Sequence, residues 1–213
     1  MHARRITIGM LAASALLVSL AGCATSGGGA SPGTEDPWLP TALPEMVTEV
    51  HAVGTVLQVD EDAPQLCLGA IAESYPPQCG GPEVVGWDWD IVEGEETASG
   101  VTWGAYAVWG DWDGETFTVT REPILAALYD PPADRDAPDP WDPALPAGPL
   151  PEDEALALQS ELEGEVPGLL ASVPLNGRLV VEVRFDDGTL QRAFDDRYGE
   201  DAVAVVAQLR PAD

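Results

Sequence analysis

Apolar and polar residues alternate in five short stretches between residues 47 and 121. β-Branched and aromatic residues dominate these stretches, and Gly, Pro and acidic residues separate them, which is typical of short strands joined by polar turns. An Asp-Trp-Asp-Gly sequence between the last two stretches predicts a hairpin turn. The sequence therefore predicts strands over residues 47–60, 66–71, 84–92, 100–110 and 115–121.

Five strands with polar turns favour a small antiparallel β-barrel or sandwich. The number of strands, and Gly54 within the first of them, resemble the oligonucleotide/oligosaccharide-binding (OB) barrel. That resemblance implies a fold and not an activity, because one fold can carry many unrelated functions.

The apolar pattern changes after residue 151. Acidic residues open the stretch 152–166, where the dipole of a helix favours negative charge, and Leu156 and Leu162 follow. We therefore expect a helix there. Residues 177–185 and 201–211 are rich in β-branched residues and predict two strands.

Residues 189–198, between those two strands, fit either a hairpin strand or a helix. Asp-Gly at 187–188 is a hairpin dipeptide, whereas Leu190, Phe194 and Tyr198 recur at four-residue spacing. We prefer the helix, which makes one right-handed βαβ unit. The predicted fold class is therefore α+β: a five-stranded barrel or sandwich followed by an α/β portion.

The first residues have the layout of a secretory signal. Arg4 and Arg5 precede an apolar run over residues 6–17, which is too short to span a membrane. The sequence Leu-Ala-Gly-Cys ending at Cys23 resembles the lipobox of bacterial lipoproteins. This resemblance implies cleavage before Cys23, attachment of diacylglycerol to its sulfur, and a membrane-anchored protein outside the cytoplasm. The alternative is an ordinary signal peptide with a cysteine near its cleavage site by chance.

The composition of the chain suggests boundaries between its parts. Gly, Ser, Pro and acidic residues follow Cys23 and predict a flexible leash, and a second Pro- and Asp-rich stretch predicts a linker. The predicted parts are a signal peptide (1–22), a leash (23–45), a β-rich domain (46–128), a linker (129–151) and an α/β portion (152–213).

The chain is strongly acidic, with a formal net charge of −28 from 37 acidic and 9 basic residues. Removing residues 1–22 would take away two arginines and no acid, which leaves −30. This charge repels nucleic-acid phosphates, so we expect no nucleic-acid partner. The sequence has no lysine, which excludes a Schiff-base lysine and a phosphate-loop lysine.

Cys67 and Cys79 enclose a short loop and, in an exported chain, are expected to form a disulfide. Zinc is the alternative, but it needs further ligands and His51 is the only histidine after the signal. Two prolines and the disulfide would hold Tyr75 rigidly within this loop, which makes Tyr75 a candidate for partner recognition. The bond between Tyr75 and Pro76 is a candidate cis peptide.

Five tryptophans lie between residues 87 and 112. On strands, Trp87 and Trp89 would share one face, and so would Trp103 and Trp109. These rings could form a platform for sugars or peptides, or they could simply fill the core of a small barrel. Trp112, at the predicted turn, is the candidate for exposure, and Tyr75, Trp89 and Trp112 are the candidate binding residues.

Two kinds of chemistry use carboxylates alone. Asp111, Asp113 and Glu115 resemble the opening of a calcium loop without its later ligands. Asp88 and Asp90 could serve a carboxylate-based glycan hydrolase.

The sequence contains no nucleophile motif and no cofactor motif, so we expect neither a catalytic site nor a cofactor. The leading hypothesis is a lipid-anchored, non-catalytic module that binds an envelope protein, peptide or glycan. A calcium-responsive protein and a glycan hydrolase are the alternatives.

Overall fold

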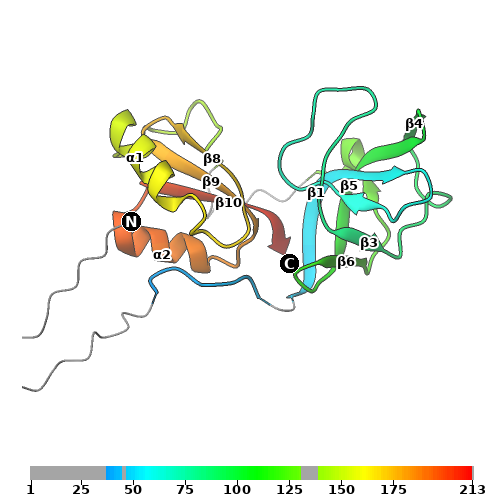
Figure 1. Cartoon of the computed structure of the whole chain (residues 1–213), viewed down its shortest axis with the longest axis horizontal. Coiled ribbons are helices and arrows are strands. Elements are labelled where there is room, and N and C mark those ends of the chain that lie inside the picture. The colour runs from blue at the N-terminus through cyan, green and yellow to red at the C-terminus, as the bar shows by residue number, and fades with distance from the viewer. Residues whose placement is uncertain (1–36, 45–46, 131–138, 213) are drawn as a thin grey trace, which may run out of the picture. The chain divides into compact units, whose positions relative to one another are not determined.

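The computed structural model describes residues 37–44, 47–130 and 139–212. The predicted signal peptide, Cys23 and most of the predicted leash lie outside these ranges. In the described part of the chain, helices and strands follow one another in this order (Figure 1): β1 (Val47–Val59), β2 (Gln65–Leu66), β3 (Glu83–Val85), β4 (Glu96–Ala98), β5 (Val101–Trp112), β6 (Thr116–Val119), β7 (Ile124–Leu125), η1 (Ala126–Leu128), α1 (Glu152–Leu162), β8 (Leu169–Leu175), β9 (Arg178–Phe185), α2 (Thr189–Tyr198) and β10 (Val203–Pro211).

Five strands close into a ring in the order β1-β2-β3-β6-β5 and back to β1. β1 and β5 form the longest pair, antiparallel from Val47 opposite Trp112 to Val59 opposite Val101. All neighbours in the ring are antiparallel except β3 and β6, which are parallel. The prediction of a mixed α+β fold is confirmed, and five strands form the ring, while the short strands β4 and β7 pair with β5 outside it. The expected purely antiparallel arrangement is not found, because β3 and β6 are parallel.

Alternating residues of the ring strands point inward and form one apolar core. Its largest buried side chains include Tyr106, Trp112 and Phe117. Gly104 is required beside Tyr106, because a Cβ atom at residue 104 would lie 2.6 Å from the tyrosine ring. The ring of Tyr106 therefore lies over the backbone of its own strand.

Two predicted strands are much shorter than expected. In place of the strand expected at 66–71 the structure has only Gln65–Leu66, and in place of the one expected at 84–92 it has only Glu83–Val85. Gly69 and Gly86 have φ values of 83° and 81°, in the left-handed region, and turn the chain out of the sheet. The prediction that Trp87 and Trp89 lie on a strand is therefore wrong, because both follow Gly86 in a loop.

The α/β portion contains a three-stranded sheet in the order β8-β9-β10. A two-residue turn at Asn176 and Gly177, both with positive φ, joins the antiparallel strands β8 and β9. β9 and β10 are parallel with α2 between them, so the helix expected at 189–198 is confirmed. The sequence did not predict β8.

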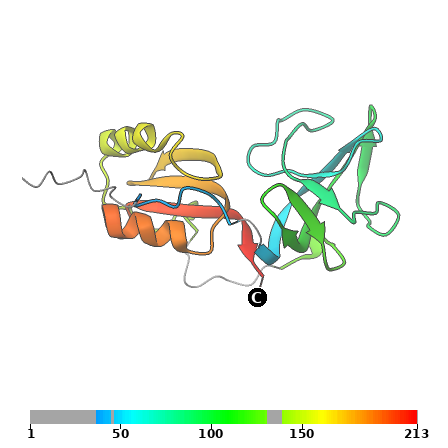
Figure 2. The same ribbon diagram turned by 60° about the horizontal axis from the view of Figure 1, so that its bottom comes forward.

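The helices α1 and α2 flank the strands of the three-stranded sheet in Figure 2, and both pack on the same apolar face of it. Leu158 and Leu162 of α1 share a core with Leu190 and Phe194 of α2, and with the alternating residues of β9. No helix in the described ranges is long and apolar enough to cross a membrane.

The chain segment before β1 packs on α2. Leu39 is buried in the core of the α/β portion, and the Trp38 ring contacts the rings of Phe194 and Tyr198 at 5.6 and 5.5 Å between centroids. The flexible leash predicted for residues 23–45 therefore does not extend through this segment. Trp38 and Leu39 bury apolar surface against the α/β portion, whereas the polar residues of a leash have too little apolar surface to pack in this way.

The described end of the predicted linker also contacts the α/β portion. The backbone N–H groups of Gly148 and Leu150 donate hydrogen bonds to the carbonyls of Asn176 and Gly177. The guanidinium of Arg178, which is buried, donates to the carbonyl of Pro146 at 2.8 Å. Backbone hydrogen bonds thus hold this stretch on the turn between β8 and β9.

Candidate functional site

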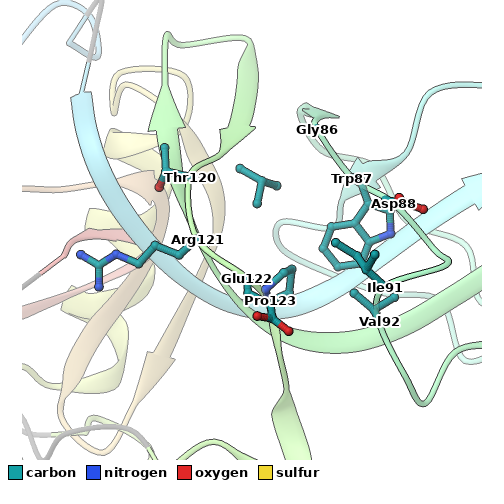
Figure 3. A pocket seen from close by; sticks show the side chains of 10 residues that line it. Gly86, Trp87, Asp88, Ile91, Val92, Thr120, Arg121, Glu122 and Pro123 are labelled. Atoms are coloured by element: carbon teal, nitrogen blue, oxygen red, sulfur yellow. The ribbon is translucent and has the colours of Figure 1, made fainter.

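A surface hollow of about 440 Å³ lies between two segments of the β-rich part (Figure 3). One wall is the loop that follows β3, and the other is the segment that runs from the end of β6 toward β7. The parallel pairing of β3 and β6 brings these walls together. The residues that line the hollow are Gly86, Trp87, Asp88, Ile91, Val92, Val119, Thr120, Arg121, Glu122 and Pro123.

The first wall is held in place from below by the ring core. The Trp87 ring packs edge-to-face on Tyr106, with 5.0 Å between ring centroids, and on Trp89, with 5.3 Å. Asp88 then accepts the backbone N–H of Asp90 at 2.9 Å and forms a tight turn. This turn carries Ile91 outward, where its side chain is 60% exposed.

The second wall is fixed by the strand beside it and by an ion pair. Thr120 donates its backbone N–H to the carbonyl of Trp109 at 2.9 Å. The guanidinium of Arg121 stacks on the Trp109 ring at 5.9 Å and forms an ion pair with Glu49. It extends away from Trp87 (Figure 3), so it does not reach across the hollow.

Glu49 joins several parts of this wall. Its carboxylate accepts hydrogen bonds from Arg121 and from the hydroxyl of Thr120, and these two contacts lower the pKa of Glu49. Its backbone N–H donates to the Asp111 carboxylate at 3.0 Å, at an irregularity in β1 where φ of Glu49 is 52°. The one arginine between residues 47 and 130 is thus occupied by a carboxylate.

The hollow combines an apolar interior with an acidic rim. Trp87, Ile91 and Val92 contribute apolar surface on one side, and Val119 and Pro123 on the other. The carboxylates of Asp88 and Glu122 belong to the lining as well. Such a surface can bury an apolar group while its rim contacts positive or hydrogen-bonding groups.

The structure buries two of the five tryptophans of the predicted platform, Trp103 and Trp112, and leaves the other three half-buried. Trp112 is only 1% exposed, so its predicted exposure at the turn is wrong; β5 extends through Trp112 and turns the ring into the core. Trp103 is also buried, against Leu57 and Cys67. Trp89 is half-buried, and its indole N–H donates to Gln58 Oε1 at 2.5 Å. Among these rings, Trp87 lines the hollow.

Tyr75 is the predicted binding residue that lies in solvent, with 72% of its surface exposed. Cys67 and Cys79 are paired as predicted, with 5.6 Å between their Cα atoms, and the Tyr75–Pro76 bond is cis. The Tyr75 ring contacts Trp103 at 5.3 Å between centroids, and its hydroxyl donates to Glu96 at 3.3 Å. Tyr75 does not line the hollow and forms a second, separate exposed surface.

Two of the three carboxylates of the predicted calcium turn, those of Asp111 and Asp113, accept hydrogen bonds from backbone N–H groups. Asp113 accepts the N–H groups of Glu115 and Thr116 at 2.9 and 2.7 Å, and these bonds lower the pKa of Asp113. Asp111 accepts the N–H of Glu49. Within the described ranges, no three His, Cys, Asp or Glu side chains gather as a metal site. The hydrogen bonds favour a structural role for this turn.

Only one of the two carboxylates considered for glycan hydrolysis belongs to the lining of the hollow. Asp88 lines the hollow and is engaged by the N–H of Asp90, whereas Asp90 is not part of the lining. Sequence reasoning missed Ile91 and the wall over residues 119–123. The only available signal was the isolated apolar pair Ile91-Val92 between acidic residues.

In comparisons with known proteins, no protein-family model, no curated protein and no solved structure matched this chain.

Proposed function

We propose that this chain is a lipid-anchored, non-catalytic binding protein of the cell envelope, and that the hollow between residues 86–92 and 119–123 is where it contacts its partner. The observation that carries the proposal is an apolar depression on a closed strand ring, with Ile91 exposed to solvent at a hydrogen-bonded turn. Exposed apolar surface rimmed by polar groups is typical of interaction sites.

The order of the strands supports an OB-type barrel within this proposal. Counting only the five ring strands along the chain, their order is 1-2-3-5-4-1, with the third and fifth parallel. The loop with Trp87 and Trp89 packs against the core between the third and fourth of these strands. A barrel of this kind presents binding residues from loops on a stable frame.

The membrane anchor rests on the sequence. Two arginines, an apolar run and Leu-Ala-Gly-Cys ending at Cys23 occur in the order of a lipoprotein signal. Two acyl chains on Cys23 would hold the protein firmly in the bilayer, with its folded part outside the cytoplasm. Intact-mass measurement of the mature protein tests this: a chain that begins elsewhere, with an unmodified thiol, contradicts it.

Site-directed photocrosslinking in intact cells tests the binding role. The chain has no lysine, so crosslinkers that react with lysine side chains have no target on it. A photoreactive amino acid is therefore placed at Glu122, on the rim, and at the exposed Glu200 as a control. We expect a product that forms from position 122 only and disappears with Ile91→Ser, but persists with Tyr75→Ala. Identical products from both positions, or a product that Ile91→Ser leaves unchanged, would place the interface elsewhere.

The non-catalytic part of the proposal has its own test. Purified protein is incubated with isolated envelope glycans, and released reducing ends are measured. We expect no turnover. Turnover that Asp88→Asn abolishes would show that the hollow is a catalytic cleft.

A further inference from the structure

The walls of the hollow continue into exposed apolar side chains along the chain. Val85 precedes the first wall and Ile124 follows the second, and both are substantially exposed, as is Ile91. The apolar part of the lining of the hollow itself consists of Trp87, Ile91, Val92, Val119 and Pro123. A partner that fills it must itself present an apolar side chain.

The β-rich part of the chain, which carries the hollow, is strongly acidic. Residues 47–130 contain sixteen Asp and Glu side chains and a single basic residue, Arg121. Glu49 and the Trp109 ring already engage the Arg121 guanidinium, which extends away from Trp87. The rim therefore offers carboxylates, and a partner gains most by placing cations there.

From these two features we infer that the hollow binds a basic, amphipathic segment of a protein partner, in which one apolar side chain is flanked by Arg or Lys. The inference rests on the proposed binding function and adds the chemistry of the partner. The apolar side chain lies against Trp87 and Ile91, and the flanking cations face Asp88 and Glu122. The same charge disfavours anionic partners such as nucleic acid and acidic lipid headgroups.

The test uses the full-length protein in detergent and three probes. They are a synthetic peptide of alternating Arg and Leu, the matched peptide of alternating Glu and Leu, and a neutral oligosaccharide. Binding is measured by titration calorimetry at low and at high salt. We expect only the basic peptide to bind, with an affinity that falls as salt increases, because exposed charge pairs are screened.

Three variants separate a specific site from general attraction to an acidic protein. Ile91→Ser should weaken binding at least tenfold without changing the charge. Glu122→Gln should weaken it several-fold and reduce its salt dependence. Glu200→Gln, which removes the same charge from the connection between α2 and β10, should have no effect. The far-ultraviolet circular dichroism of each variant verifies that it is folded.

Equal losses from Glu122→Gln and Glu200→Gln would overturn the inference, since the attraction would then be diffuse. Binding of the oligosaccharide that does not depend on salt would overturn it as well and would assign the Trp87 ring to sugars. If no peptide binds while Ile91→Ser still removes the photocrosslinked partner, the partner chemistry is wrong but the proposed function stands.

Discussion

Gln191 on α2 covers the edge of β10 that faces away from β9, and its removal gives a quantitative test of the α/β portion. Its side-chain N–H group donates to the Val203 carbonyl and to the Asp195 carboxylate, both at 2.9 Å. Its side-chain oxygen accepts the Val205 N–H, also at 2.9 Å. Each such bond contributes about 1 kcal/mol net, so Gln191→Ala should cost about 2 to 3 kcal/mol.

The assay is urea unfolding followed by tryptophan fluorescence. With a slope of about 2 kcal/mol per molar, Gln191→Ala should lower the midpoint by roughly 1 M. Thermal unfolding should move down by about 4 to 12 °C for a chain of this size. Asp196→Ala, an exposed position on the same helix, is the control and should change neither value.

Gln191→Glu provides a second, independent readout, because glutamate keeps the shape but cannot donate when ionised. Its carboxylate would face the Val203 carbonyl and the Asp195 carboxylate, which should raise its pKa in the folded protein. The native state would then hold a proton that the unfolded state releases, so the variant should become more stable as pH falls toward the unfolded value. A Gln191→Ala midpoint within error of the parent, or a Gln191→Glu variant with the parent's pH dependence, would refute this account of the edge.

Three further predictions concern the rest of the fold. Replacing both Cys67 and Cys79 by alanine should lower the free energy of unfolding by about 3 kcal/mol, because the disulfide closes a loop with a sequence separation of 12. A reducing agent that leaves the urea midpoint of the parent protein unchanged would contradict this. Gly104→Ala should lower the free energy of unfolding, measured in urea, by about 1 to 3 kcal/mol, since the new Cβ atom would lie 2.6 Å from the Tyr106 ring. Gly80→Ala is the control and should be tolerated, because a Cβ atom there meets nothing within 4 Å. Burial raises the pKa of Asp186 above 3.8, so the carboxyl of Asp186 keeps its proton to higher pH in the native protein than in the unfolded protein. The free energy of unfolding should therefore fall as pH rises from the unfolded pKa through the native pKa. Asp186→Asn should remove this part of the fall in a series of urea midpoints measured against pH.

Local patterns predicted the elements whose side chains alternate clearly or recur at helical spacing. β1, β5 and β6 were visible because β-branched and aromatic residues follow a period of two. α2 was visible because Leu190 and Phe194, four residues apart, both face the core. β8 was missed because its sequence Leu-Leu-Ala-Ser-Val-Pro-Leu does not alternate and contains Pro174, which is unusual within a strand.

The candidate site could not be predicted because non-local contacts create it. Its walls are more than 25 residues apart in sequence and meet only through the parallel pairing of β3 with β6. Trp87 and Asp88 were recognised as candidates, but on a strand that Gly86 in fact ends. A glycine in an apolar stretch does not by itself specify the left-handed conformation that Gly86 adopts.

The packing of Trp38 and Leu39 on α2 has a mechanical consequence for a tethered protein. Tension applied from the amino-terminal side acts on residues 37–44 before it acts on β1. The ring contacts of Trp38 and the burial of Leu39 resist it there. These contacts can detach one after another, as in peeling, while the ladder between β1 and β5 stays intact. Fully extended, residues 37–44 span at most about 27 Å, at roughly 3.4 Å per residue, so their release would lengthen the tether of the proposed membrane-anchored protein before the folded parts come under load.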